Sequence, residues 1–286
     1  MKKLLFTFLI LVASLKLSAQ TDPIVLFPEG APHEKAGAYI EKNDISGPKN
    51  SGLTVNRMSG VSVPLITIYN ARIPSRDNKT VVVCPGGGYG ILAYDLEGTE
   101  ICRMLSDNGI NAVLLKYRVP RREGREKHAA ALEDVQRAIS VVRSRADEFG
   151  LNPNQIGVMG FSAGAHLSVM ASNSERTYAK IDSCDNQPVR PDFCAIIYPA
   201  YLSGANFGLA ADVKPSPQTP PTFIVQAQDD TNYIDSALFY YYALKDNKVP
   251  VTMHLYSDGG HGYGLRQTGK LVNTWPLRFV EWVKSL

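Results

Sequence analysis

The chain has 286 residues, of which 44% are hydrophobic and 20% charged, with a formal net charge of +3. This balance is ordinary for a soluble globular protein, and the length suits one large α/β domain or two small ones. The sequence contains no basic block and no interleaving of aromatic and basic residues. A nucleic-acid partner is therefore not expected.

The N-terminus has the layout of a secretory signal peptide. Lys2 and Lys3 precede an apolar run over residues 4–15, and Leu17-Ser18-Ala19 supplies a small-residue ending. The pattern predicts a signal peptide over residues 1–19 and a periplasmic or secreted protein with no membrane partner after cleavage. The alternative is a short membrane anchor, but the run is short for a hydrocarbon layer of about 30 Å. Without this segment and its three lysines, the formal charge is zero.

The rest of the chain alternates apolar runs with segments of helical periodicity, which predicts a mostly parallel, doubly wound sheet flanked by helices. We expect a single α/β domain over residues 20–286, with 21–60 wrapping the surface and 202–221 forming an irregular excursion. The expected strands are 65–69, 80–84, 112–117, 156–160, 194–198, 222–226 and 251–256. The expected helices are 98–108, 128–149, 163–172, 234–246 and 276–286.

The four cysteines have wide, irregular spacings that match no zinc pattern. Cys84 and Cys102 lie in apolar segments and are expected to be buried thiols. Cys184 and Cys194 could form a disulfide in an oxidising compartment or remain thiols, because spacing does not fix connectivity. The sequence indicates no cofactor and no metal site.

A serine stands between two glycines where a predicted strand turns into a predicted helix, in Gly160-Phe161-Ser162-Ala163-Gly164. This is the arrangement of a nucleophile elbow, in which small neighbours let strand and helix pack around a strained turn. The N-terminus of the following helix would place backbone N–H groups beside a developing oxyanion. A small-residue turn that only allows close packing is the alternative, and it would need no partners downstream.

Partners do follow downstream. Asp229 and Asp230 come after a predicted buried strand, and His261 stands between glycines after the next one. The order serine, acid, histidine is the order that this sheet topology requires for a catalytic triad. We assign the acid to Asp229, the first residue past the strand, with Asp230 as the alternative. His166 is expected to pack or hydrogen-bond beneath the elbow, since the helix carries it away from the Ser162 oxygen.

Three glycines, Gly86, Gly87 and Gly88, directly follow the strand 80–84. Their N–H groups can approach a substrate oxygen without hindrance from a Cβ atom, as an oxyanion hole requires. A phosphate-binding loop is disfavoured, because the Gly-Lys-Ser/Thr ending is missing.

Several motifs together resemble the α/β-hydrolase esterases related to acetylxylan and other carbohydrate acetyl esterases, the BD-FAE-like family. They are IVLFPEGAP (24–32), CPGGGY (84–89), LLKYRVP (114–120), GVMGFSAGAHL (157–167), PPTFIVQAQDD (220–230) and GGHGYG (259–264). The resemblance implies Ser162, Asp229 and His261 as the triad. It also implies the N–H groups of Gly87, Gly88 and Ala163 as oxyanion donors. Pro85 stands where the related lipase loop has histidine, which leaves the Tyr89 N–H as another candidate donor. Arg118 and Asp134 are residue types that recur in sequences of this family, and we interpret them as a structural ion pair.

The expected function is that of a secreted serine esterase that removes acetyl groups from plant polysaccharides such as acetylated xylan. The acetyl preference comes from the resemblance alone, and a feruloyl or other carboxylesterase is an alternative. A dipeptidyl-peptidase-like serine peptidase shares fold and triad order, but such enzymes usually carry a large additional domain that 286 residues do not accommodate. A binding module that has lost its chemistry is disfavoured by the intact triad residues.

Overall fold

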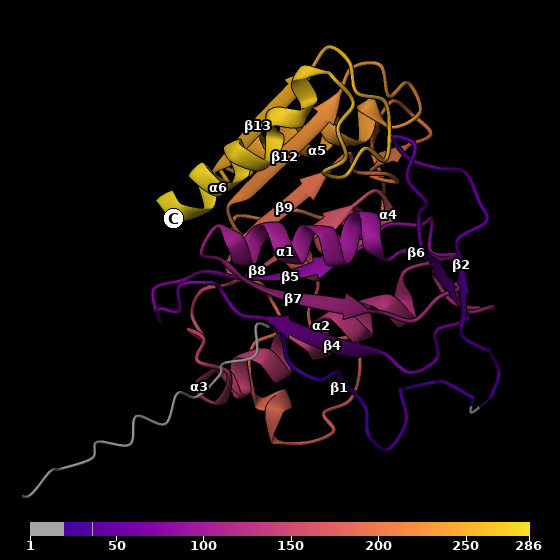
Figure 1. Cartoon of the computed structure of the whole chain (residues 1–286), viewed down its shortest axis with the longest axis vertical. Coiled ribbons are helices and arrows are strands. Elements are labelled where there is room, and N and C mark those ends of the chain that lie inside the picture. Colours follow the sequence, from indigo (N-terminus) through magenta and orange to yellow (C-terminus); the bar gives the residue numbers. More distant parts are fainter. Residues whose placement is uncertain (1–19, 36) are drawn as a thin grey trace, which may run out of the picture.

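The computed structural model describes residues 20–35 and 37–286, and the predicted signal peptide lies outside these residues. Its centre is an eight-stranded sheet in the order β1-β4-β7-β5-β8-β9-β12-β13 (Figure 1). The six strands from β7 to β13 in this order run parallel, and β4 is antiparallel to both of its neighbours. The strands are β1 (Ile24–Val25), β4 (Leu65–Tyr69), β5 (Thr80–Cys84), β7 (Asn111–Lys116), β8 (Ile156–Phe161), β9 (Cys194–Ile197), β12 (Thr222–Ala227) and β13 (Val251–Tyr256).

The central strands are apolar on both faces because helices cover both faces. In β5, Val82 and Cys84 pack into one hydrophobic cluster, whereas Val81 and Val83 pack into a second cluster on the opposite face. Side chains of a strand alternate between its two faces, so an uninterrupted apolar run is the sequence of a strand buried on both sides. The sheet therefore separates two cores.

Helices from different parts of the chain share each face. Helices α1 (Glu100–Asp107) and α6 (Trp275–Ser285) contribute to one cluster and lie in front of the strands in Figure 1. Helices α2 (Ala129–Ser144), α3 (Ala146–Phe149), α4 (Ala163–Asn173) and α5 (Ile234–Asp246) contribute to the other. A π-helical segment, η1 (Asp95–Thr99), runs directly into α1, and two short 3₁₀ helices are η2 (Ser183–Asn186) and η3 (Leu271–Thr274).

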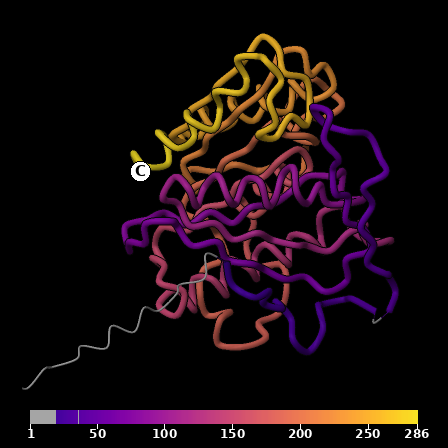
Figure 2. Tube along the Cα trace, viewed as in Figure 1, coloured from indigo at the N-terminus to yellow at the C-terminus, as the bar shows by residue number. Residues whose placement is uncertain are grey.

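The N-terminal segment follows the edge of the molecule and reaches the C-terminal loops (Figure 2). The Asn50 side chain donates to the Gly262 carbonyl at 2.8 Å, and Arg266 donates to the Thr54 carbonyl at 2.9 Å. A small sheet is formed by β2 (Lys42–Asp44), β3 (Arg57–Ser59) and β6 (Leu92–Ala93), and β10 (Ser203–Gly204) pairs with β11 (Gly208–Leu209). The segment thus supports the loop that carries His261.

The expected α/β fold is confirmed, and each strand and helix anticipated from the sequence has a counterpart within a few residues. The expected long helix over 128–149 divides into α2 and α3 at Arg145. Arg118 and Asp134 form the expected buried ion pair, with Nη2 to Oδ1 at 2.9 Å. Over the described ranges, no helix is both long enough and apolar enough to span a bilayer.

All four cysteines are free. Of the two alternatives for Cys184 and Cys194, the disulfide is therefore wrong, and both residues are thiols. Cys194 is the first residue of the buried strand β9, and Cys184 belongs to η2, which packs against α2. Both side chains pack against the same hydrophobic cluster, but from different elements and without a bond between them.

Candidate active site

Ser162 stands at the turn between β8 and α4 in a backbone conformation that is rare for a residue with a side chain, with φ 53° and ψ −117°. Such a conformation stores strain and persists only where the surrounding structure fixes it. Here the Ser162 N–H donates to the Ile197 carbonyl of β9 at 3.1 Å, and its carbonyl accepts the Ala200 N–H at 3.2 Å. The neighbouring strand therefore fixes the elbow.

The two glycines of the motif are required by close backbone approach. A Cβ atom on Gly160 would lie 2.0 Å from the Gly164 carbonyl oxygen, and one on Gly164 would lie 2.1 Å from the Cys84 carbonyl oxygen. Neither distance is possible for real atoms without backbone movement. The glycines let helix, strand and glycine loop meet at the serine, as expected for a nucleophile elbow.

Three side chains from separate loops form one chain of hydrogen bonds. His261 Nε2 lies 2.8 Å from Ser162 Oγ, and His261 Nδ1 lies 2.7 Å from Asp230 Oδ2. The Asp230 side chain is almost fully buried, whereas the His261 side chain is 30% exposed. An ionised carboxylate can only accept, so Nδ1 donates its proton to Asp230 and Nε2 is free to accept the serine proton.

The assignment of the acid to Asp229 is wrong in this geometry. Asp229 Oδ1 accepts the Gly260 N–H at 2.7 Å, and the Asp229 side chain also faces Lys270. The pKa of Asp229 is lowered, and the hydrogen bond from the Gly260 N–H is the largest cause of this shift. Strand β12 ends at Ala227, and a turn closed by the Asp230 N–H on the Ala227 carbonyl brings Asp230, rather than Asp229, under the imidazole.

The glycine loop after β5 lies against Ser162. An ideal Cβ atom on Gly86 would lie 2.9 Å from Ser162 Cβ. The Gly87 carbonyl accepts the N–H groups of Gly90 and Ile91, at 3.0 and 3.1 Å, which closes the loop.

Among the described residues, no acceptor bonds to the N–H groups of Gly87, Gly88 or Tyr89. The N–H of Ala163, the first residue of α4, likewise has no acceptor within its helix. These donors are available for a substrate oxygen.

A buried carboxylate, Glu97, connects the glycine loop with the histidine. Its Oε2 accepts the Gly86 N–H at 2.7 Å, and its Oε1 accepts the Tyr198 hydroxyl at 2.8 Å. Burial, the largest effect, raises the pKa of Glu97. The Tyr198 ring in turn contacts the His261 ring, with centroids 5.1 Å apart. Glu97 therefore positions the loop and the imidazole together.

Two further tyrosines surround the site. The Tyr233 ring lies 4.8 Å from the His261 ring, centroid to centroid. Tyr201 stacks on Tyr89 with centroids 6.4 Å apart, and its hydroxyl lies 3.6 Å from the position of an ideal Cβ on Gly88. Tyr201 thus stands beside the glycine loop.

His166 lies beneath the elbow, as expected. Its side chain is fully buried, and its Nδ1 pairs with the Tyr89 hydroxyl at 2.8 Å. No local sequence pattern indicated Glu97 or Tyr198, since both act through contacts between segments far apart in the chain. It did contain the signal for Asp230, which was the alternative acid.

Residues 66–193 match the BD-FAE family model. The acetylxylan esterase of Xylanibacter ruminicola is 27% identical over 234 residues, which are 73% of this chain and 46% of that protein. Endo-1,4-beta-xylanase B of Butyrivibrio fibrisolvens is 29% identical over 213 residues, which are 64% of this chain and 32% of that protein. The chain thus spans half or less of the length of these relatives.

A solved structure extends the similarity over nearly the whole chain. The acetyl ester-xyloside bifunctional hydrolase from Caldicellulosiruptor lactoaceticus superimposes with a TM-score of 0.72 at 28% identity, covering 94% of this chain and 98% of that one. The resemblance seen in the sequence motifs is therefore confirmed. The chain has the α/β-hydrolase fold, and its residues 66–193 match the BD-FAE family model.

Proposed function

We propose that this protein is a serine esterase that removes acetyl groups from plant polysaccharides such as acetylated xylan. The single observation that carries the proposal is the chain of hydrogen bonds from Ser162 through His261 to Asp230, at 2.8 and 2.7 Å. A hydroxyl, an imidazole and a buried carboxylate in this order form the catalytic unit of serine hydrolases.

In the first half of the reaction, Ser162 Oγ attacks the ester carbonyl carbon while His261 Nε2 takes the serine proton. Asp230 stabilises the imidazolium and keeps Nδ1 protonated. The C–O bond to the sugar then breaks, and His261 passes its proton to the departing sugar oxygen. The acetyl group remains on Ser162 as an ester.

The negative charge of the tetrahedral intermediate needs donors that are already in place. The Ala163 N–H and the N–H groups of Gly87 and Gly88 are the proposed donors. Ala163 directly follows Ser162, the glycine loop approaches Ser162 at Gly86, and these N–H groups have no partner among the described residues. One such donor is worth about 3 kcal/mol of transition-state stabilisation.

In the second half, a water molecule replaces the sugar. His261 Nε2 takes a proton from the water, whose oxygen attacks the acetyl carbonyl carbon. Collapse of the intermediate breaks the bond to Ser162 Oγ, which receives the proton from His261 and releases acetate. The resting hydrogen bonds are restored.

The relatives support the substrate class. The names of two similar proteins, an acetylxylan esterase and an acetyl ester-xyloside hydrolase, point to acetylated xylan or its fragments. The predicted signal peptide over residues 1–19 supports a periplasmic or secreted location, where a polysaccharide is accessible.

The test is acetate release from acetylated xylan, pectin and mannan, with p-nitrophenyl acetate as a small substrate. We expect release from at least xylan and p-nitrophenyl acetate, and loss of both activities in Ser162→Ala. Activity on p-nitrophenyl acetate without release from any polysaccharide would refute the substrate class alone. Hydrolysis of chromogenic amino-acid amides instead of esters would indicate a peptidase.

A further inference from the structure

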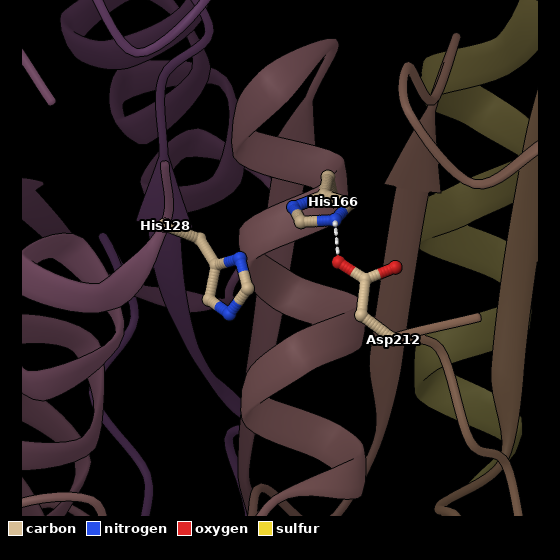
Figure 3. A group of neighbouring side chains, drawn as sticks. All are labelled: His128, His166 and Asp212. Atoms are coloured by element: carbon tan, nitrogen blue, oxygen red, sulfur yellow. Dashed lines mark ion pairs between the residues drawn. The ribbon is translucent and has the colours of Figure 1, made fainter. Parts of the chain in front are cut away.

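A second group of polar side chains lies apart from the triad. His128 precedes α2, His166 belongs to α4, and Asp212 lies in the irregular segment before β12 (Figure 3). One ligand atom from each of these residues lies within 4.8 Å of the other two. Residues from three separate segments thus face one point.

Two nitrogen atoms in this group are buried and have no hydrogen-bond partner, namely His128 Nδ1 and His166 Nε2. The His128 residue is 7% exposed and the His166 residue is fully buried. His166 Nε2 lies 3.8 Å from Asp212 Oδ2, a separation that allows an ion pair with a protonated imidazole but is too long for a hydrogen bond (Figure 3). Leaving a polar atom buried without a partner costs about 1–3 kcal/mol. A bound species between the three side chains would remove this cost.

The chemistry of the set is that of a transition-metal site. Two imidazoles and one carboxylate are common zinc ligands, with bonds of about 2.0–2.2 Å, which places ligand atoms about 3.3 Å apart in a tetrahedron. Contraction from the observed separations needs movements of about 1 Å or less for each side chain. Asp212 is 41% exposed at its side chain, so water can reach a fourth position.

The surroundings favour neutral imidazoles in fixed orientations. Burial lowers the pKa of His128 to about 4 and also lowers the pKa of His166. A neutral imidazole is the form that coordinates a metal. His166 Nδ1 pairs with the Tyr89 hydroxyl at 2.8 Å, which fixes the ring and directs Nε2 toward the cluster, as outer contacts do in metal sites.

We propose that His128, His166 and Asp212 bind a divalent transition-metal ion of the zinc class. The ion would connect the start of α2, the helix after the nucleophile and the segment between β11 and β12. Tyr89 directly follows Gly88 and its hydroxyl pairs with His166, so the ion would also fix the glycine loop through Tyr89. The proposal does not depend on the esterase activity.

The test is calorimetric titration of the chelator-treated protein with ZnCl₂ alone, followed by the visible spectrum of the Co²⁺-loaded protein. The triad also contains a histidine and a carboxylate and could itself bind zinc. The His261→Ala variant, in which the triad can no longer compete for the ion, is therefore titrated as well. We expect one equivalent of Zn²⁺ in both wild type and His261→Ala, and the intense absorption of tetrahedral Co²⁺.

Two ligand variants and one matched control complete the test. His128→Ala and Asp212→Asn should weaken Zn²⁺ binding by about 100-fold or more, because loss of outer contacts alone costs about 10- to 100-fold. His33→Ala removes an exposed histidine outside the cluster and should bind as wild type does. Asp212→Asn changes a partly exposed residue, so it keeps the test valid if His128→Ala does not fold.

Three results would overturn the proposal. They are no Zn²⁺ binding by wild type, binding that both ligand variants retain, and binding that His261→Ala abolishes. The first result would mean that an ordered water satisfies the two imidazoles. The third would place the metal at the triad.

Discussion

At the scale of single residues, the two adjacent acids after β12 have different roles. Asp230 is buried and accepts from His261, whereas Asp229 is 40% exposed and accepts from the Gly260 backbone. Asp229 therefore supports the backbone of the histidine loop, and Asp230 orients the imidazole.

This difference predicts unequal effects of a matched pair of substitutions. Asp230→Asn should lower kcat on p-nitrophenyl acetate by about 10⁴-fold, because the imidazole loses the acceptor that sets its tautomer. Asp229→Asn should lower kcat by about tenfold at most, since it removes charge from one loop contact. Steady-state kinetics of both variants is the measurement. A larger loss in Asp229→Asn would contradict the assignment.

Some residues of the site could be identified from local sequence patterns, and others could not. Ser162 and His261 could be identified because glycines flank them and strands precede them. The choice between Asp229 and Asp230 depends on where β12 ends and how the next turn is closed. The local sequence does not determine either of these. Glu97 and Tyr198 meet across 101 positions of the chain, so no local pattern reveals them.

At the scale of elements, the site depends on the close approach of β5, β8 and α4. A Cβ atom on Gly164 would lie 2.1 Å from the Cys84 carbonyl oxygen and 2.6 Å from the Pro85 carbonyl oxygen. Both are backbone atoms at the start of the glycine loop, so they cannot rotate away as a side chain could. Gly90, in the same loop, has open space by comparison, with its nearest neighbour 3.7 Å away.

Gly164→Ala should lower the free energy of unfolding by about 1–3 kcal/mol and also reduce esterase activity, because the added methyl group pushes the loop from the elbow. Gly90→Ala, the control, should stay within about 0.5 kcal/mol of wild type. Urea unfolding of both variants measures the difference. Equal stability of the two would show that the elbow is not tightly packed.

The sheet was the most predictable set of elements. Its long strands read as unbroken apolar runs because both faces are covered, as in β5 and β8, where every residue is buried. The two- and three-residue strands, such as β2 and β6, could not be predicted. So few residues show no periodicity, and their pairing is decided by distant segments.

At the scale of the whole molecule, ion pairs connect segments that the sheet does not join. Arg137 of α2 donates to both Asp182 oxygens, at 2.9 and 2.6 Å, just before η2. The pKa of Asp182 is lowered to about 2, and the hydrogen bonds from Arg137 are the largest cause of this shift. A carboxylate with a lowered pKa stabilises the fold above its ordinary pKa, and this contribution is lost as the pH falls toward 2.

Asp182→Asn should therefore lower the free energy of unfolding at pH 7 by about 1 kcal/mol, a value reduced for the partial exposure of the pair. The deficit should shrink at about pH 3, because Asp182 of the unfolded chain, with its ordinary pKa, then takes up a proton and the unfolded state of the wild type gains stability relative to the folded state. Urea unfolding at both pH values is the measurement. The exposed Glu175→Gln should show no deficit at either pH. A deficit in Asp182→Asn that is independent of pH would contradict the ionic origin.

We propose that Ser162 is the nucleophile of one catalytic unit with His261 and Asp230. The most direct measurement is mass spectrometry of the intact protein after reaction with a fluorophosphonate, followed by peptide mapping. We expect a single covalent adduct on Ser162, formed much more slowly in His261→Ala and Asp230→Asn. An unlabelled Ser162 in the folded protein, or labelling that does not depend on His261, would contradict it.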